Sequence, residues 1–234
     1  MVFDKKRLIS GSIIFAILIF FYLFKLNSLL IITLIILSIY DILYSKIVTI
    51  NFLIFSFISM LIFFLFFFSD FPLTVFIFIS SILLLISFFK FKINNIFILL
   101  LCCFFYSLYV INFDKNLIYI IIMISFVNDT SAYFFGRTLK GPLIIPNISP
   151  KKTWSGTVSS FSISVLLFKY FGFDFYYSII LSISLFLGDI YFSFIKRILK
   201  IKDFSNLIPG HGGILDRIDS LFFLPFIIMI FNSF

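Results

Sequence analysis

The feature that most constrains this chain is a series of long apolar segments that contain no charged residue. Residues 8–24, 51–68 and 73–89 each run for 17 or 18 residues without Lys, Arg, Asp or Glu. A helix needs roughly 17–25 such residues to cross a bilayer. Of the 234 residues, 62% are hydrophobic and 12% are charged, whereas soluble domains carry about 25% charged residues. The sequence therefore predicts an all-α polytopic membrane protein.

The apolar segments divide the chain into about nine transmembrane helices. We expect them at residues 8–24, 26–44, 50–68, 72–89, 96–111, 117–136, 155–171, 175–195 and 220–232. With nine spans, 15 of the 18 basic residues fall on the side of the N-terminus, and only Lys25, Lys115 and Lys169 fall on the other. Basic residues that flank spans stay in the cytoplasm. The N-terminus is therefore expected in the cytoplasm and the C-terminus outside.

The two halves of the chain differ in their polar residues. Residues 1–115 are apolar runs joined by short connections, and we expect them to form an N-terminal transmembrane scaffold of about five helices. Residues 116–234 hold most of the polar side chains, and we expect them to form a catalytic transmembrane region. Its two longer loops, 137–154 and 196–219, lie on the cytoplasmic side by the charge count.

The first polar cluster lies at the cytoplasmic end of the expected span 117–136. Asp129, Tyr133 and Arg137 are spaced by four residues, so they share one helix face. An ionisable side chain inside a span is costly and is a functional hypothesis by default. The alternative is that Asp129 pairs with Arg137, or with another helix, only to hold the bundle together.

The second polar cluster directly precedes the expected span 155–171. Ser149, Lys151, Lys152 and Thr153 offer hydroxyl and ammonium donors after the helix-breaking Pro150. Such donors suit a phosphate at a helix N-terminus, where free N–H groups and the helix dipole add to the lysines. The alternative is an ordinary basic anchor at the membrane interface.

The third cluster runs from Asp189 to Asp219. Asp189, Ser193 and Arg197 recur every four residues and place a carboxylate and a cation on one helix face. Asp216 and Asp219 are expected to open the last span on one face. Carboxylates are the protein ligands that Mg²⁺ uses while it also binds substrate phosphates. The cluster therefore predicts magnesium-assisted chemistry on phosphates.

The loop in this cluster contains three glycines, Gly210, Gly212 and Gly213, and the single histidine of the chain, His211. Glycines allow the backbone to approach a ligand closely. His211 is either structural or part of the site. No Walker A loop, Ser-His-Asp arrangement or zinc-type Cys/His spacing is found in the sequence.

Residues 193–219 resemble the long signature of phosphatidate cytidylyltransferases. The resemblance rests on Ser193-x-x-Lys196-Arg197, Lys202-Asp203 and Pro209-x-His211-Gly-Gly-x-x-Asp216-Arg217-x-Asp219. Two further segments match in the expected order, Asp129…Ala132-Tyr133…Gly136-Arg137 and Ser149-Pro-Lys-Lys-Thr-Trp154…Gly156. The resemblance covers about residues 125–225. Two positions depart from it, since Ser155 and Phe192 stand where the family has Glu.

The resemblance implies the reaction of CTP with phosphatidate to give CDP-diacylglycerol and pyrophosphate, with Mg²⁺ as cofactor and, less directly, a potassium ion beside it. It implies Asp189 and Asp216 as the metal-binding residues. We expect the catalytic residues to be Asp189, Asp216, Lys196, Arg197 and His211. We expect the substrate-binding residues to be Ser149, Lys151, Lys152, Thr153, Asp129, Arg137, Ser193, Gly210, Gly212, Gly213, Arg217 and Asp219.

Two other functions are the alternatives. One is a CTP-dependent lipid (polyprenol) kinase, and the other is a membrane transporter or channel whose aspartates serve an ion path. The partners that we expect are CTP, phosphatidate and membrane lipid, without nucleic acid, and a homodimer is left open. We expect a multi-pass protein of the bacterial inner membrane with its active site facing the cytoplasm.

Overall fold

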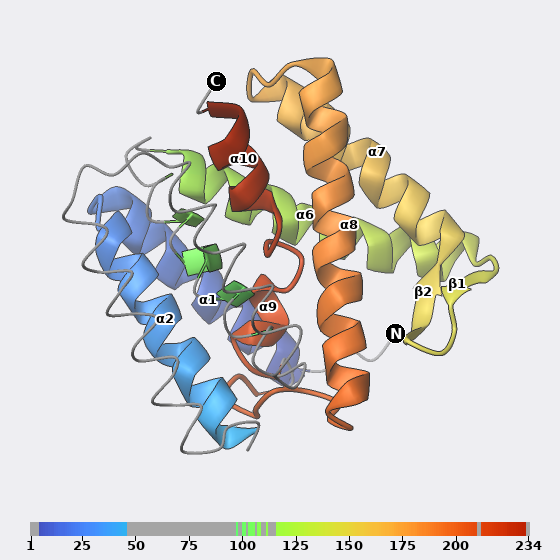
Figure 1. Ribbon diagram of the computed structural model, residues 1–234, viewed down its shortest axis with the longest axis horizontal. Coiled ribbons are helices and arrows are strands. Elements are labelled where there is room, and N and C mark those ends of the chain that lie inside the picture. Colours follow the sequence, from blue (N-terminus) through green and yellow to red (C-terminus); the bar gives the residue numbers. More distant parts are fainter. Residues whose placement is uncertain are drawn as a thin grey trace, which may run out of the picture.

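The computed structural model describes residues 5–45, 116–209 and 212–232, together with scattered positions between 97 and 111 (Figure 1). The elements in chain order are α1 (Lys5–Leu23), α2 (Asn27–Tyr44), α6 (Leu117–Leu139), β1 (Leu143–Ile145), β2 (Ser149–Thr153), α7 (Trp154–Tyr170), α8 (Phe175–Ile198), α9 (Leu215–Ile218) and α10 (Leu224–Asn232). The expected spans 50–68 and 72–89 lie outside the described residues, and 96–111 is described only in part.

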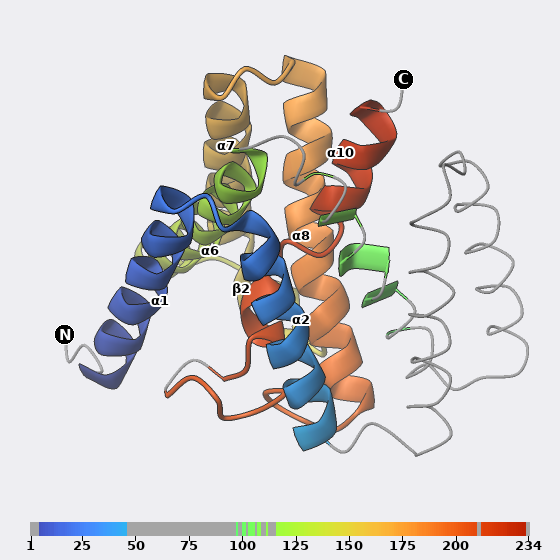
Figure 2. The same ribbon diagram turned by 90° about the vertical axis from the view of Figure 1, so that its left-hand side faces the viewer.

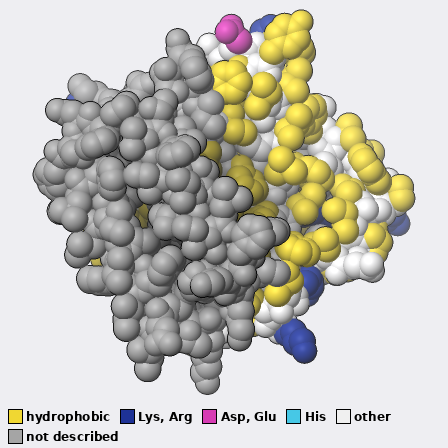
Figure 3. Space-filling model, viewed as in Figure 1, with side chains coloured by type: hydrophobic (Ala, Val, Ile, Leu, Met, Phe, Trp, Pro, Cys, Tyr) yellow, Lys and Arg dark blue, Asp and Glu magenta, His cyan; other side chains and the backbone are white. Residues whose placement is uncertain are grey.

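Three of these helices, α2, α6 and α8, are long and apolar enough to cross a membrane. The outer face of α8 is typical of such a helix, because Ile183, Leu187 and Phe194 are large, apolar and exposed. Hydrophobic side chains cover most of the face of the described residues that Figure 3 shows, with Lys and Arg mainly at its edges. The helical membrane character is thus confirmed, while the number of nine spans and the orientation remain predictions.

The C-terminal helices pack as a chain of neighbours, with α6 on α7, α7 on α8, and α10 on α8. In Figure 1, α6 runs across the direction of α8. The contact of α6 with α7 is close, since a Cβ atom at Gly156 would lie 2.5 Å from the Ala132 carbonyl oxygen. The helices α1 and α2 pack on each other, and the end of α2 lies beside the segment that leads into α9 (Figure 2).

The expected loop 137–154 is more ordered than the sequence predicted. Its first residues extend α6, and the rest contains the antiparallel hairpin of β1 and β2, in which Leu143 pairs with Thr153 and Ile145 with Ser149. The hairpin leads directly into α7, because Thr153 is both the last residue of β2 and the N-cap of α7, where its side-chain oxygen accepts from the Gly156 N–H at 3.3 Å. The segment 149–153 is therefore a strand.

The predicted last span 220–232 is shorter in the structure, where α10 begins at Leu224. Asp216 lies in the four-residue helix α9 and Asp219 in the turn that follows, so these two aspartates do not open the last span as expected. Pro225 stands in the first turn of α10, where its missing N–H is tolerated. The same missing N–H would break a helix that continued from α9.

Four aromatic rings pack together in the core beside α8. Phe192 of α8 is fully buried, and its ring centre lies 5.3 Å from that of Phe97, 5.9 Å from that of Phe204 and 5.0 Å from that of Phe222. Such edge-to-face contacts add to the stabilisation from burial. Because Phe204 and Phe222 both contact Phe192, the cluster attaches the two ends of the segment 204–222 to α8.

Candidate active site

The hairpin and α8 are joined by an ion pair between Lys152 of β2 and Asp189 of α8. The two side chains are 22% and 27% exposed, so the pair lies partly out of water. The Lys152 Nζ atom also lies 5.9 Å from the ring centre of Phe186, one turn before Asp189. In the sequence, Asp189 shares a helix face with Arg197, whereas in the structure its ion pair is with Lys152 of another element.

A second charged group joins the C-terminal end of α8 to α9. The Lys196 Nζ atom lies 2.9 Å from Asp216 Oδ1 and 3.9 Å from Asp219 Oδ2. The other oxygen of Asp216 accepts from the backbone N–H groups of Phe204, at 2.9 Å, and Gly213, at 3.0 Å. Both oxygens of Asp216 therefore have protein donors, and the orientation of this carboxylate is tightly determined.

The two charged groups meet where the turn after α9 contacts α8. A Cβ atom at Gly188 would lie 2.5 Å from the Asp219 carbonyl oxygen and 2.9 Å from that of Ser220. Only glycine permits this approach, which brings Asp219 close to Asp189. Burial raises the pKa of Asp219 well above its usual range, and the negative charges of Asp189 and Asp129 raise this pKa further.

Asp129 of α6 also belongs to this cluster. Its Oδ2 atom accepts from the Ser220 hydroxyl at 3.3 Å, and that hydroxyl also lies 2.7 Å from the Ser125 hydroxyl. Electrostatic interactions link Asp129 to Asp189 and Lys152. The site thus combines four carboxylates, from α6, α8, α9 and the turn after α9, with the lysines of β2 and α8.

Several of the predicted site residues have other contacts in the structure. The Arg137 guanidinium donates to the Tyr133 hydroxyl at 2.9 Å in an exposed position, and the alternative pairing with Asp129 is absent from its described contacts. The Arg197 Nε atom donates to the Ile148 carbonyl oxygen at 2.9 Å and connects α8 to the hairpin. Thr153 serves as the cap of α7.

The remaining predicted residues lie around the same region. Ser149 is half-buried in β2, Ser193 is half-buried in α8, and the backbone of Lys151 belongs to β2. Gly212 has a positive φ of 79°, which favours glycine, and Arg217 is exposed in α9 and interacts electrostatically with Asp129. Gly210 and His211 lie outside the described residues.

The suitability of this cluster for Mg²⁺ follows from its donor set. Among the residues that the structure describes, no three Asp, Glu, His or Cys side chains converge as ligands for one ion. However, Mg²⁺ in phosphate-transferring sites is usually held by one or two carboxylates together with the substrate phosphates. The ion pairs of Lys152 with Asp189 and of Lys196 with Asp216 mark the carboxylates that would serve. A site that the substrate completes is compatible with this arrangement.

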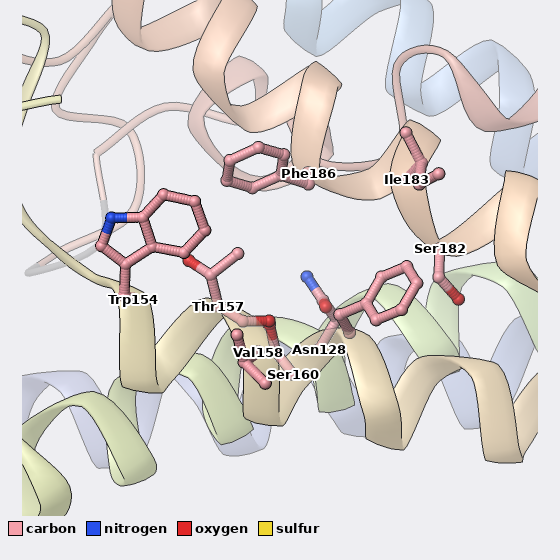
Figure 4. A pocket seen from close by; sticks show the side chains of 9 residues that line it. Asn128, Trp154, Thr157, Val158, Ser160, Ser182, Ile183 and Phe186 are labelled. Atoms are coloured by element: carbon pink, nitrogen blue, oxygen red, sulfur yellow. The ribbon is translucent and has the colours of Figure 1, made fainter. Parts of the chain in front are cut away.

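A cavity of about 190 Å³ lies beside the charged cluster, between α6, α7 and α8. Figure 4 shows Trp154 and Phe186 on one side, Ile183 and Ser182 on the other, and Asn128 between the helices. Asn128 precedes Asp129 in the chain, and Phe186 contacts the Lys152 charge. The cavity is therefore an apolar neighbour of the polar site.

The two departures from the expected family pattern have structural explanations. The Ser155 hydroxyl donates to the Lys140 carbonyl oxygen and lies 3.2 Å from the Thr153 hydroxyl, so it connects the end of α6 to the start of α7. Phe192 belongs to the aromatic cluster described above, where a Glu carboxylate would be buried among rings. In this chain Ser155 therefore makes hydrogen bonds that join two helices, and Phe192 packs in the core.

Sequence reasoning missed four polar residues around the site. They are Asp41, Asn128, Ser205 and Ser220. Ser205 and Ser220 are short side chains in connecting segments, and no spacing in the sequence relates them to Asp129 or Asp41. The buried carboxylate of Asp41, which occurs inside an apolar run, was the one signal that could have been used.

The chain is similar to known proteins of one family. The model of the cytidylyltransferase family matches residues 4–234. The chain is 42% identical over 109 residues to a protein of Rickettsia typhi named phosphatidate cytidylyltransferase, covering 40% of this chain and 48% of that protein. It is 37% identical over 139 residues to the protein of the same name from Bacillus subtilis, covering 53% of this chain and 52% of that protein. The chain spans about half the length of the curated relatives it matches.

Proposed function

The chain belongs to the cytidylyltransferase family, and from this membership we propose that it makes CDP-diacylglycerol and pyrophosphate from CTP and phosphatidate. The observation that carries the proposal is the cluster in which Lys152 and Lys196 stand between the carboxylates of Asp189, Asp216 and Asp219. Such alternating charges suit a reaction that joins two polyanions. Two relatives that bear the name phosphatidate cytidylyltransferase support the choice of substrates.

In the proposed reaction, a phosphate oxygen of phosphatidate attacks the α-phosphorus of CTP. A P–O bond forms at that phosphorus as the bond to the β-phosphate oxygen breaks, and pyrophosphate leaves with the electron pair. The attacking phosphate monoester has its second pKa at about 6, so it is already an anion near neutral pH. No strong general base is needed, and the main requirement is to hold two anions in line.

The lysines are proposed to supply the positive charge for this alignment. Lys152 lies in β2 directly before the N-terminus of α7, and Lys196 is only 14% exposed. A partly buried ammonium group interacts with a phosphate more strongly than one in water, because less solvent screens the charge. Lys151, Arg197 and Arg217 are proposed to contact the outer phosphates.

Asp189 and Asp216 are proposed to hold Mg²⁺ when the substrates bind. The ion would supply further positive charge at the phosphates. Asp189 lies on α8 and Asp216 on α9, and the close packing of Gly188 against the turn after α9 brings these two elements together. Lys152 and Lys196 would then shift from the carboxylates toward the incoming phosphates.

The lipid substrate is proposed to reach the site from the bilayer. The apolar cavity between α7 and α8 borders Lys152 through Phe186 and could receive the part of phosphatidate next to its phosphate. Its acyl chains would remain among the lipids. The charge distribution of the sequence favours the cytoplasmic face of a bacterial inner membrane for the headgroup chemistry.

The test uses purified protein, phosphatidate in mixed micelles, Mg²⁺, and CTP labelled at either the α- or the γ-phosphate. We expect α-label in the lipid extract and γ-label in pyrophosphate. Transfer of γ-label to the lipid would identify a kinase instead, and the absence of both products would contradict the proposal. A preparation of the Asp216→Asn variant, purified in the same way, controls for enzymes of the expression host.

A further inference from the structure

Asp41 is a buried carboxylate in α2, outside the C-terminal region that holds the other site residues. Its side chain is inaccessible to solvent. The Ser205 hydroxyl donates to Asp41 Oδ1 at 2.6 Å, and the Leu215 N–H donates to Asp41 Oδ2 at 2.8 Å. A carboxylate is costly to bury in an apolar helix unless each oxygen has a donor. The two hydrogen bonds therefore hold the Asp41 side chain against Ser205 and Leu215.

The two donors to Asp41 lie next to the residues that orient Asp216. Ser205 follows Phe204, whose N–H donates to Asp216 Oδ2 at 2.9 Å. Leu215 directly precedes Asp216 in α9. Asp41 thus contacts the chain at Ser205 and at Leu215, each adjacent in sequence to a residue of the Asp216 interaction.

Gly213 connects the two carboxylates directly. Its N–H donates to Asp216 Oδ2 at 3.0 Å. On its other side, a Cβ atom at Gly213 would lie 2.3 Å from Asp41 Oδ2 and 2.7 Å from Asp41 Cγ. The backbone at Gly213 is therefore packed between Asp41 and Asp216. A displacement of one carboxylate would move this backbone and so shift the other carboxylate.

The helix α9 depends on Asp41 for its first turn. It has only four residues, and its N-cap residue, Ile214, makes no side-chain capping hydrogen bond. Asp41 accepts from the first N–H of the helix, as a capping side chain would, although it is 174 residues away in the sequence. A helix of one turn is not stable alone, so the orientation of Asp216 within it depends on this contact.

We propose that Asp41 is a positioning residue for the active site: by holding Ser205 and Leu215, it sets the Asp216 carboxylate opposite Lys196. This inference rests on the proposed function for its catalytic consequence, while its structural part concerns the loop alone. Asp41 touches neither Lys196 nor a reacting atom in this arrangement. The competing explanation is that Asp41 only stabilises the helix bundle as a whole.

The experiment compares Asp41→Ala and Asp41→Asn with the control Ser38→Ala. Ser38 is a buried polar residue of the same helix, but its hydroxyl donates to the Leu34 carbonyl oxygen within α2. Hydrogen exchange followed by mass spectrometry measures the protection of residues 204–215. Steady-state kinetics with CTP measures kcat and KM separately.

We expect Asp41→Ala to accelerate exchange in residues 204–215 while α6, α7 and α8 keep their protection. Its kcat should fall roughly tenfold to a hundredfold, because a displacement of about 1 Å at a reacting group has that effect, and KM for CTP should change less. Asp41→Asn should recover part of kcat, since its amide oxygen accepts from Leu215 and its NH₂ donates to Ser205. Ser38→Ala should resemble the wild type.

A second pair of variants tests the link through Gly213. Gly213→Ala alone should mimic Asp41→Ala, because its methyl group would collide with the Asp41 carboxylate. In the Asp41→Ala background that space is open, so adding Gly213→Ala should reduce kcat and loop protection less than it does in the wild type. Additive losses would contradict the proposed contact.

Unchanged exchange in residues 204–215 of Asp41→Ala would overturn the proposal, and so would a general loss of protection in Asp41→Ala and Asp41→Asn alike. If Asp41→Ala fails to fold, the Ser205→Ala variant tests the proposal instead. It removes one of the two donors to Asp41 and keeps the Asp41 carboxylate in place, and it should still accelerate exchange in residues 204–215. If the wild type transfers no α-label, the proposed function fails, and the exchange measurements alone still support or refute the positioning role.

Discussion

A single methyl group at Gly188 should disturb the site more than it disturbs the helix that carries it. In Gly188→Ala, the new Cβ atom would lie 2.5 Å from the Asp219 carbonyl oxygen, which would have to retreat by about 0.9 Å to reach the 3.4 Å of ordinary contact. Overpacking of this kind costs about 1–3 kcal/mol. Replacement of Gly by Ala inside a helix gains about 1 kcal/mol. The net loss of stability should therefore lie between about zero and 2 kcal/mol.

The matched control is Gly11→Ala. Gly11 also lies inside a helix, α1, but a Cβ atom there would have no neighbour within 4 Å. This variant should show only the gain of about 1 kcal/mol. The difference between the two variants isolates the packing cost at the contact between α8 and the turn, and thermal unfolding in detergent measures it.

The effect on activity should be larger than the effect on stability. Gly188 adjoins Asp189, and the displaced turn carries Asp219, whose carboxylate lies 3.9 Å from Lys196. A shift of about 1 Å between these groups should lower kcat by roughly a hundredfold. The reasoning is refuted if Gly188→Ala is stabilised as much as Gly11→Ala and transfers α-label from CTP at the wild-type rate.

Three further predictions concern charge, metal and topology. Lys196→Met should lower the stability by about 3–5 kcal/mol in chemical unfolding, because it leaves two buried carboxylates without their cation; an unchanged midpoint would contradict this. Asp189→Asn and Asp216→Asn should each abolish label transfer in a protein that still inserts into the membrane, because each removes a charge that Mg²⁺ needs. The double variant should be scarcely less active than either single variant, and near-normal turnover in either single variant would exclude the metal assignment. In a chain without its two native cysteines, an impermeant maleimide added to intact cells should label Tyr176→Cys and spare Asn206→Cys, and the opposite pattern would invert the proposed orientation.

Much of the membrane architecture could be predicted because hydrophobicity is a local property. A segment such as 175–195 is apolar over its whole length, so its helical state in a membrane follows from its own composition. The structure places α8 at Phe175–Ile198 and α7 at Trp154–Tyr170, within a few residues of the expected spans. The hairpin before α7 was missed, because two strands of three and five residues carry too little periodicity to be recognised.

The chemistry of the site could be predicted only as a set of residues. Asp129 was identified because a charged group inside a membrane span is costly, and Asp189 and Asp216 were identified because carboxylates suit Mg²⁺ and match the family pattern. Their partners could not be identified in this way. The sequence relates Asp189 to the cations of its own helix, whereas the structure pairs it with Lys152 of β2.

By itself, the sequence determined the apolar helices, the family pattern and the identity of the carboxylates and lysines, since each of these depends on residue type and short-range spacing. The tertiary structure decided which side chains meet. Spacing along a helix defines a face but not the element that packs on that face. Three contacts join segments that are far apart in the chain: Lys152 with Asp189, Ser220 with Asp129, and Asp41 with the first N–H of α9. Only the packing of α2, α6 and α8 around α9 and the turn after it brings these side chains together.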